Sequence, residues 1–188
     1  MRILILAYEN EGVALAKVGR HLESNGHQVL LLQGDTTCVT TLPKILDTHR
    51  KSGFISRVHT LHGPLTSYQA EPKVVDWEYL RYFEREVCSQ RNLLQLLLTD
   101  QVLFDYHHFR RPYYHPNRTA RSVFALAAHV LRWLERQFDT FMPDQVFTLG
   151  RNYFVKNAVA EIARVRNVKL VAVVPGRLLD FWYPTTDL

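Results

Sequence analysis

The chain has 188 residues, of which 47% are hydrophobic, and it carries a formal net charge of +5 at pH 7 together with nine histidines. This length fits one domain, and the apolar content is enough for a buried core and argues against an intrinsically disordered chain. The basic charge indicates either an anionic partner, such as phosphate, nucleotide, nucleic acid or lipid head groups, or simply a mildly basic surface.

Cys38 and Cys88 are too few and too far apart for a disulfide framework or a zinc site, and we expect no bound metal. They fit a reducing compartment. No apolar run approaches the roughly 20 residues that a membrane span needs, and the N-terminus lacks the long apolar core of a signal peptide. We therefore expect a cytoplasmic protein, either free or peripheral at the inner face of the membrane.

The first 33 residues predict a strand, a helix and a second strand. Residues 2–7 form an unbroken apolar run, which suits a strand that is covered on both faces. Apolar residues then recur at helical spacing over residues 15–22, and Gly26 predicts the end of that helix because glycine accepts a left-handed backbone. A second apolar run over residues 27–33 completes a crossover unit, from which a parallel sheet can grow.

The middle of the chain predicts further elements. Residues 54–61 alternate enough for a third strand, and residues 102–105 suit another short strand. Asp76 is a good N-cap for a long helix that reaches residue 98, or for two helices with a break over residues 89–92.

The last third of the chain alternates between helix and strand patterns. Asn117 can cap a helix that residues 142–144 stop, and residues 145–149 predict a strand. Residues 152–165 then suit a helix, and residues 168–174 suit a last apolar strand.

This order of elements predicts an α/β fold, a Rossmann-like three-layer sandwich with a mostly parallel sheet and helices on both faces, over residues 1–188 as a single domain. In such a sheet, ligands bind outside the carboxyl ends of the strands. The segments expected at that edge are residues 8–12, 34–35, 106–111, 150–152 and 175–177.

The segment Tyr8-Glu-Asn-Glu-Gly12 does not suit a dinucleotide phosphate. A dinucleotide fingerprint needs three glycines, whereas this segment has only Gly12 and two carboxylates that would repel a phosphate. Glu9 or Glu11 could instead act as a general base toward an uncharged hydroxyl. Alternatively, both carboxylates simply favour the positive end of the helix that follows.

Residues 106–115 combine histidines, arginines and aromatic rings. The guanidinium groups of Arg110 and Arg111 suit phosphate, and aromatic rings can stack on bases or on sugar faces. The segment itself contains no acidic residue or Cys beside His107, which argues against a metal site. The segment therefore suits a nucleotide, a sugar phosphate or a lipid-linked pyrophosphate, or else it is a rim loop that covers the edge of the sheet.

Two further arginines follow predicted strands. Arg151 and Asn152 open a predicted helix, where backbone amides can bind an anion, and Arg177 follows the next strand. Either arginine could also be an ordinary surface residue.

Several parts of the chain carry a family resemblance. The start Met1-Arg-Ile-Leu-Ile-Leu, the helix after it and Gly26-His27-Gln28-Val29 resemble the opening of a GT-B glycosyltransferase. The later parts resemble the N-terminal half of capsular or surface-polysaccharide biosynthesis proteins, and they are Phe83-Glu84, residues 93–100, Pro143-Asp144 and Pro175-Gly-Arg-Leu-Leu-Asp180. The likeness covers nearly the whole chain through pattern and order.

The resemblance implies the N-terminal half of a two-domain transferase, which mostly holds a saccharide or lipid-linked saccharide acceptor. A C-terminal half or a partner subunit would mostly hold the nucleotide-sugar donor, and no covalently bound cofactor is implied. The donor-binding carboxylate and glycine turns of that half have no counterpart here, so we expect this chain to be inactive alone. Its base toward the acceptor hydroxyl would be Glu9, Glu11 or His107. The residues expected to bind substrate are Tyr8, Gly12, Arg110, Arg111, Arg151, Asn152 and Arg177.

Two other functions stay open. The first is a non-catalytic, flavodoxin-like module that binds a phosphorylated ligand or a partner protein. A response-regulator version of it needs an acidic cluster after the first strand, which Glu9 and Glu11 resemble, and a Lys after a late strand, which we do not find. The second is nucleic-acid binding, which has only the net charge in its favour, and we expect no nucleic-acid partner.

Overall fold

The computed structural model describes residues 1–8, 11–34, 57–60, 74–88, 92, 120–150, 154–175 and 182–185. The elements in chain order are β1 (Arg2–Tyr8), α1 (Glu11–Ser24), β2 (Gln28–Gly34), β3 (Arg57–Thr60), α4 (Trp77–Tyr82), the π-helical turn η1 (Phe83–Val87), α7 (Ala120–Phe141), β4 (Gln145–Leu149), α8 (Phe154–Val165), β5 (Lys169–Pro175) and β6 (Trp182–Thr185). The predicted helix stop at residues 142–144 and the predicted strand at residues 145–149 are confirmed. The strand expected at residues 102–105 lies outside the described residues.

The strands form one sheet in the order β3-β2-β1-β4-β5-β6. The first five strands in this order are parallel to their neighbours, and β6 pairs with β5 in the antiparallel direction. Strands β2 and β3 lie on one side of β1, and β4, β5 and β6 lie on its other side, so the strand order reverses at β1. Such a reversal is a topological switch point, where open α/β sheets place their ligands. The predicted α/β, Rossmann-like fold with a mostly parallel sheet is confirmed.

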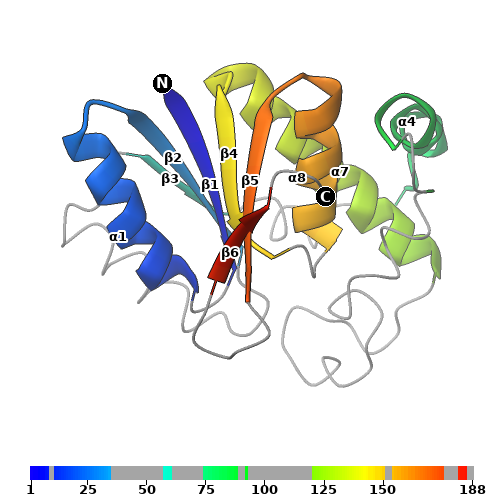
Figure 1. The fold of residues 1–188 in the computed structure, drawn as a ribbon. Helices are drawn as coiled ribbons and strands as arrows, with labels where there is room; N and C mark the ends of the chain where they lie inside the picture. The colour runs from blue at the N-terminus through cyan, green and yellow to red at the C-terminus, as the bar shows by residue number, and fades with distance from the viewer. Residues whose placement is uncertain are drawn as a thin grey trace.

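The sheet is covered on both faces, as the unbroken apolar run of β1 predicts (Figure 1). Ile3 and Ile5 pack on the face under α1, whereas Leu4 and Leu6 pack on the face under α7 and α8. Successive side chains of a strand point to opposite faces, so a strand between two helical layers must be apolar at every position.

At the amino edge of the sheet, the chain start contacts the connection between α7 and β4. The Asp144 N–H donates to the Arg2 carbonyl at 2.8 Å, and the Asp144 carboxylate accepts from the Arg2 N–H at 2.6 Å. These contacts lower the pKa of the Asp144 carboxyl, chiefly through the Arg2 N–H.

The helix after Asp76 is shorter than a helix that reaches residue 98. It continues from α4 into η1 and ends at Cys88, whose backbone is not helical (φ −88°, ψ 74°). The uninterrupted long helix is therefore wrong, and the first helix of the alternative ends as expected just before residues 89–92. The second helix of that alternative lies outside the described residues. β6 was not expected from the sequence, because it contains Pro184, which is tolerated at an edge strand but gives no strand signal.

Candidate functional site

The starts of α1 and α8 meet at the carboxyl edge of the sheet, on either side of the switch point. Helix α1 begins at Glu11, three residues after the end of β1, and α8 begins at Phe154, five residues after the end of β4. Strands β1 and β4 are paired neighbours, so both helix starts lie close to the same point of the edge. Gly150 makes the turn out of β4 with a left-handed backbone (φ 64°), and its N–H donates to the Val173 carbonyl at 2.7 Å.

An ion pair joins the two helix starts. The Lys156 Nζ, in the first turn of α8, donates to the Glu11 Oε1 at 2.8 Å and also to the Leu149 carbonyl at the end of β4. The Lys156 side chain is only 1% exposed, whereas the Glu11 side chain is 27% exposed. A buried ammonium is tolerated only when it is paired and hydrogen-bonded, which the carboxylate and the carbonyl provide here.

Other buried polar side chains lie near this pair along the chain. Thr148 is 1% exposed, and its Oγ1 finds no hydrogen-bond partner among the described residues. Asn157, next to Lys156 in α8, is completely buried. Helix α8 is buried along Phe154–Ala163, so Lys156, Asn157 and Glu161 are enclosed instead of facing solvent. Lys156 and Asn157 thus place two buried polar side chains in the first turn of α8.

The structure places three of the predicted site residues at this edge. Glu11 takes part in the ion pair, Tyr8 ends β1, and Gly12 lies in the first turn of α1. Their roles toward a substrate stay predictions. The remaining predicted residues lie outside the described part of the chain, and they are Glu9, His107, Arg110, Arg111, Arg151, Asn152 and Arg177.

Lys156 is the site residue that the sequence analysis missed. A Lys does lie beside an acidic residue at the carboxyl edge, contrary to the expectation that no such Lys is present. The sequence of α8 gives no clear signal for this role, because the helix also carries Asn157, Glu161 and Arg164 and such residues are expected on a solvent-facing side. The structure shows that Lys156 is enclosed and that Glu11 is its partner.

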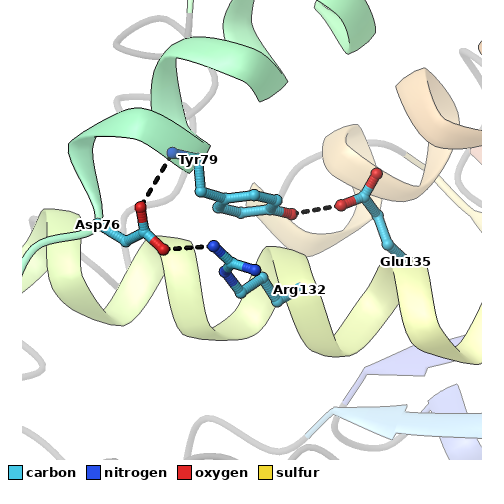
Figure 2. Close-up of polar contacts among 4 residues, drawn as sticks. All are labelled: Asp76, Tyr79, Arg132 and Glu135. Atoms are coloured by element: carbon cyan, nitrogen blue, oxygen red, sulfur yellow. Dashed lines mark hydrogen bonds and ion pairs between the residues drawn. The ribbon is translucent and has the colours of Figure 1, made fainter.

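A second polar cluster joins α4 to α7 on the outer side of the helical layer (Figure 2). Asp76 caps α4 by accepting from the Tyr79 N–H at 3.0 Å, and it also binds the Arg132 guanidinium. The same guanidinium lies 4.1 Å from the centre of the Tyr79 ring, and the Tyr79 O–H donates to the Glu135 Oε2 at 2.6 Å. Each partner is used inside the cluster, so we assign the cluster to the attachment of α4.

The cluster shifts the pKa values of two of its members. The pKa of the Asp76 carboxyl is lowered chiefly by the Tyr79 N–H that donates to it. Burial opposes this shift, and Arg132 adds to it. Burial raises the pKa of the Tyr79 phenol, and the hydrogen bond to Glu135 raises it further.

A reactive thiol, a metal site and a membrane-spanning helix are the other features to consider in the described part of the chain. Burial raises the pKa of the Cys88 thiol to about 12, so this thiol is not a nucleophile at neutral pH. Within the described residues, no three His, Cys, Asp or Glu side chains are grouped so that they could share a metal ion. None of the described helices combines the length and apolar character that crossing a bilayer requires.

No protein-family model and no curated protein matches the chain. Among solved structures, UDP-GlcNAc 2-epimerase from Neisseria meningitidis bound to UDP-GlcNAc is similar at 12% identity and a TM-score of 0.49, over 92% of this chain and 31% of that one. The glycosyltransferase VinC in complex with dTDP is similar at 14% identity and a TM-score of 0.45, over 93% of this chain and 34% of that one.

The chain thus spans about a third of the length of these two proteins. At these identities and TM-scores the similarity carries no argument about ligands or activity, so the function has to be argued from the chain's own residues.

Proposed function

We propose that residues 1–188 form the acceptor-side domain of a sugar-nucleotide-dependent glycosyltransferase that builds surface or capsular polysaccharide. In this proposal the domain is the N-terminal half of a longer two-domain protein, or it works with a partner subunit. The observation that carries the proposal is the Glu11–Lys156 ion pair at the switch point, where a Rossmann-like sheet receives its ligands.

The partly exposed Glu11 carboxylate suits the chemistry of an acceptor. It can accept a hydrogen bond from a saccharide hydroxyl and take its proton as the hydroxyl oxygen attacks the anomeric carbon of the donor and the bond from that carbon to the nucleotide's phosphate oxygen breaks, releasing the nucleotide. In the proposal, Tyr8 and Gly12 line the same edge, and Glu9 or His107 is the alternative base. The remaining contacts to phosphate or sugar are assigned to Arg110, Arg111, Arg151, Asn152 and Arg177.

The donor nucleotide sugar is assigned mostly to the C-terminal half or the partner subunit, with no covalently bound cofactor. A cytoplasmic location, either free or peripheral at the inner face of the membrane, belongs to the same proposal, as does the absence of a nucleic-acid partner.

A second candidate function is a non-catalytic module that binds a phosphorylated ligand. The observation in its favour is the Lys156 ammonium, which lies in the first turn of α8 and could pair with a phosphate if Glu11 moved aside. The two candidates differ in whether the chain by itself binds a phosphate-bearing ligand.

The experiment that separates them is a calorimetric titration with UDP, GDP and their sugars. It compares the 188-residue chain with the full product of the native gene. Binding by the full product alone would agree with an acceptor-side domain whose donor site lies elsewhere. Tight binding of a nucleotide by the 188-residue chain would contradict the acceptor-side proposal and favour the self-contained phosphate-binding module.

A further inference from the structure

We propose that Lys156 is a positioning residue for Glu11, and that the pair makes the β1–β4 end of the carboxyl edge a contact point for a hydroxyl group and not for a phosphate. The saccharide nature of the hydroxyl rests on the proposed function. The positioning of Glu11 by Lys156 does not.

The exposures of the two side chains separate their roles. Lys156 is 1% exposed and Glu11 is 27% exposed, so a ligand at the edge reaches the carboxylate first and the ammonium not at all. Lys156 can therefore act on a ligand only through Glu11. A carboxylate accepts hydrogen bonds and donates none, so it binds a hydrogen-bond donor such as a hydroxyl.

The anchoring of Lys156 explains why it can fix Glu11. Its Nζ also donates to the carbonyl of Leu149, the last residue of β4, so the ammonium is held to the sheet. Glu11 stands at the first position of α1, and the ion pair ties its carboxylate to that fixed point. A glutamate without this partner would sample several rotamers, and a ligand would have to order it on binding.

The charge arrangement also disfavours a phosphate at this point. The buried cation is already matched by Glu11 and by a carbonyl, and the more exposed member of the pair is the anion. An incoming phosphate would meet the carboxylate before the ammonium, and like charges at contact distance repel.

The test uses the 188-residue chain with Lys156→Met, Lys156→Arg, Glu11→Gln and the double variant of Lys156→Met with Glu11→Gln. Met matches the length of the lysine stem, and Arg keeps the cation. Lys17→Met, an exposed position on α1, is the matched control. Crystal structures of the Met and Arg variants report the position of the Glu11 carboxylate. Saturation-transfer NMR measures binding of glucose, galactose and N-acetylglucosamine, and calorimetry measures binding of inorganic phosphate.

We expect the Glu11 carboxylate to leave its position in Lys156→Met and to keep it in Lys156→Arg. Saccharide binding should fall up to about tenfold in Lys156→Met, which corresponds to the loss of one pre-ordered side chain. Glu11→Gln should lose binding to a similar extent, the double variant should be no weaker than either single variant, and phosphate binding should not weaken. The Lys17→Met control should match the unsubstituted chain.

An unmoved Glu11 in Lys156→Met would overturn the positioning role, and weaker phosphate binding in that variant would assign Lys156 to an anion instead. If the Arg variant does not fold, the Met variant decides alone. Failure of the unsubstituted chain to bind any of the saccharides would count against the proposed function. The position of Glu11 in the Met variant would still decide the positioning role.

Discussion

At the residue scale, the Glu11–Lys156 pair joins two very different environments. The ammonium is enclosed between α8 and the end of β4, whereas the carboxylate keeps contact with solvent. Removing one member of such a pair costs more when the member left behind is the buried one, because the remaining charge then loses its counter-charge and is shielded from water.

This asymmetry gives a stability prediction. Glu11→Ala should lower the free energy of unfolding by about 3 kcal/mol, because it removes the carboxylate that neutralises a buried ammonium. Lys156→Met should cost only about 1 kcal/mol, because water can solvate the carboxylate that remains. Urea unfolding measures both, and the exposed Lys17→Met should change stability by less than about 0.5 kcal/mol. A larger loss in Lys156→Met than in Glu11→Ala would show that the burial argument is wrong.

Thr148 offers a second prediction at a single side chain. Its Oγ1 is buried without a hydrogen-bond partner in the described part of the chain, and such a group carries a desolvation cost. Thr148→Val has nearly the same shape and should raise the free energy of unfolding by about 1 kcal/mol. Thr140→Val, at an exposed position on α7, is the control and should have no such effect. A destabilised Thr148→Val protein would mean that the hydroxyl does have a partner in solution.

Single residues also show how far the sequence alone could lead. The position of Glu11 was predictable, because a carboxylate just after an unbroken apolar strand must lie near the carboxyl edge. Its partner was not, because Lys156 lies 145 positions further along the chain and no local pattern connects them. The sequence pattern of α8 does not show that Lys156 is buried, since the helix carries other polar residues.

At the element scale, α4 depends on a cap and an ion pair that share one carboxylate. Asp76→Ala removes both the hydrogen bond from the Tyr79 N–H and the contact with Arg132. We expect a loss of about 1–2 kcal/mol in the free energy of unfolding, most of it from the cap. Asp76→Asn can still accept from the Tyr79 N–H and should lose less than half as much. Equal losses in chemical unfolding of the two variants would assign the effect to the ion pair instead.

The hydrogen bond from Tyr79 to Glu135 makes the attachment of α4 depend on pH. The pKa of Tyr79 is raised in the folded protein, so its contribution is fully present below the pKa of an unfolded tyrosine, about 10, and is lost as pH rises through the folded value. Tyr79→Phe should therefore show a smaller fall in stability between pH 9 and pH 11 than the unsubstituted chain. Thermal unfolding across that range measures the difference. Identical slopes for the two proteins would contradict the buried hydrogen bond to Glu135.

The helices and strands differ in how well the sequence predicted them. The end of α1 at Gly26 was predicted and is confirmed by a left-handed backbone there (φ 81°) and by the His27 N–H that donates to the Leu22 carbonyl. The π-helical turn after α4 was not predicted, since one extra residue per turn leaves the apolar spacing of a short segment almost unchanged. Strand β6 was missed because it pairs at an edge and contains a proline.

At the scale of the whole molecule, the order of the strands decides where a ligand can bind. The strand order reverses between β1 and β4, and the Glu11–Lys156 pair lies at the carboxyl ends of these two strands. Arg2 and Asp144 form their contacts at the opposite, amino edge. The layers of the fold were predictable from the alternation of apolar runs and helical periods. Which side chains meet at the carboxyl edge was not, because that depends on contacts between distant segments.

The central claim, that ligands bind at the carboxyl edge between β1 and β4, is tested most directly by amide NMR of the ¹⁵N-labelled chain. Glucose, galactose, N-acetylglucosamine and inorganic phosphate are titrated in turn. We expect saccharides to shift the amides of Glu11, Gly12 and Gly150, and phosphate to leave those of Glu11 and Gly12 unchanged. Shifts confined to Arg2 and Asp144 at the amino edge, or to the cluster between α4 and α7, would contradict the claim.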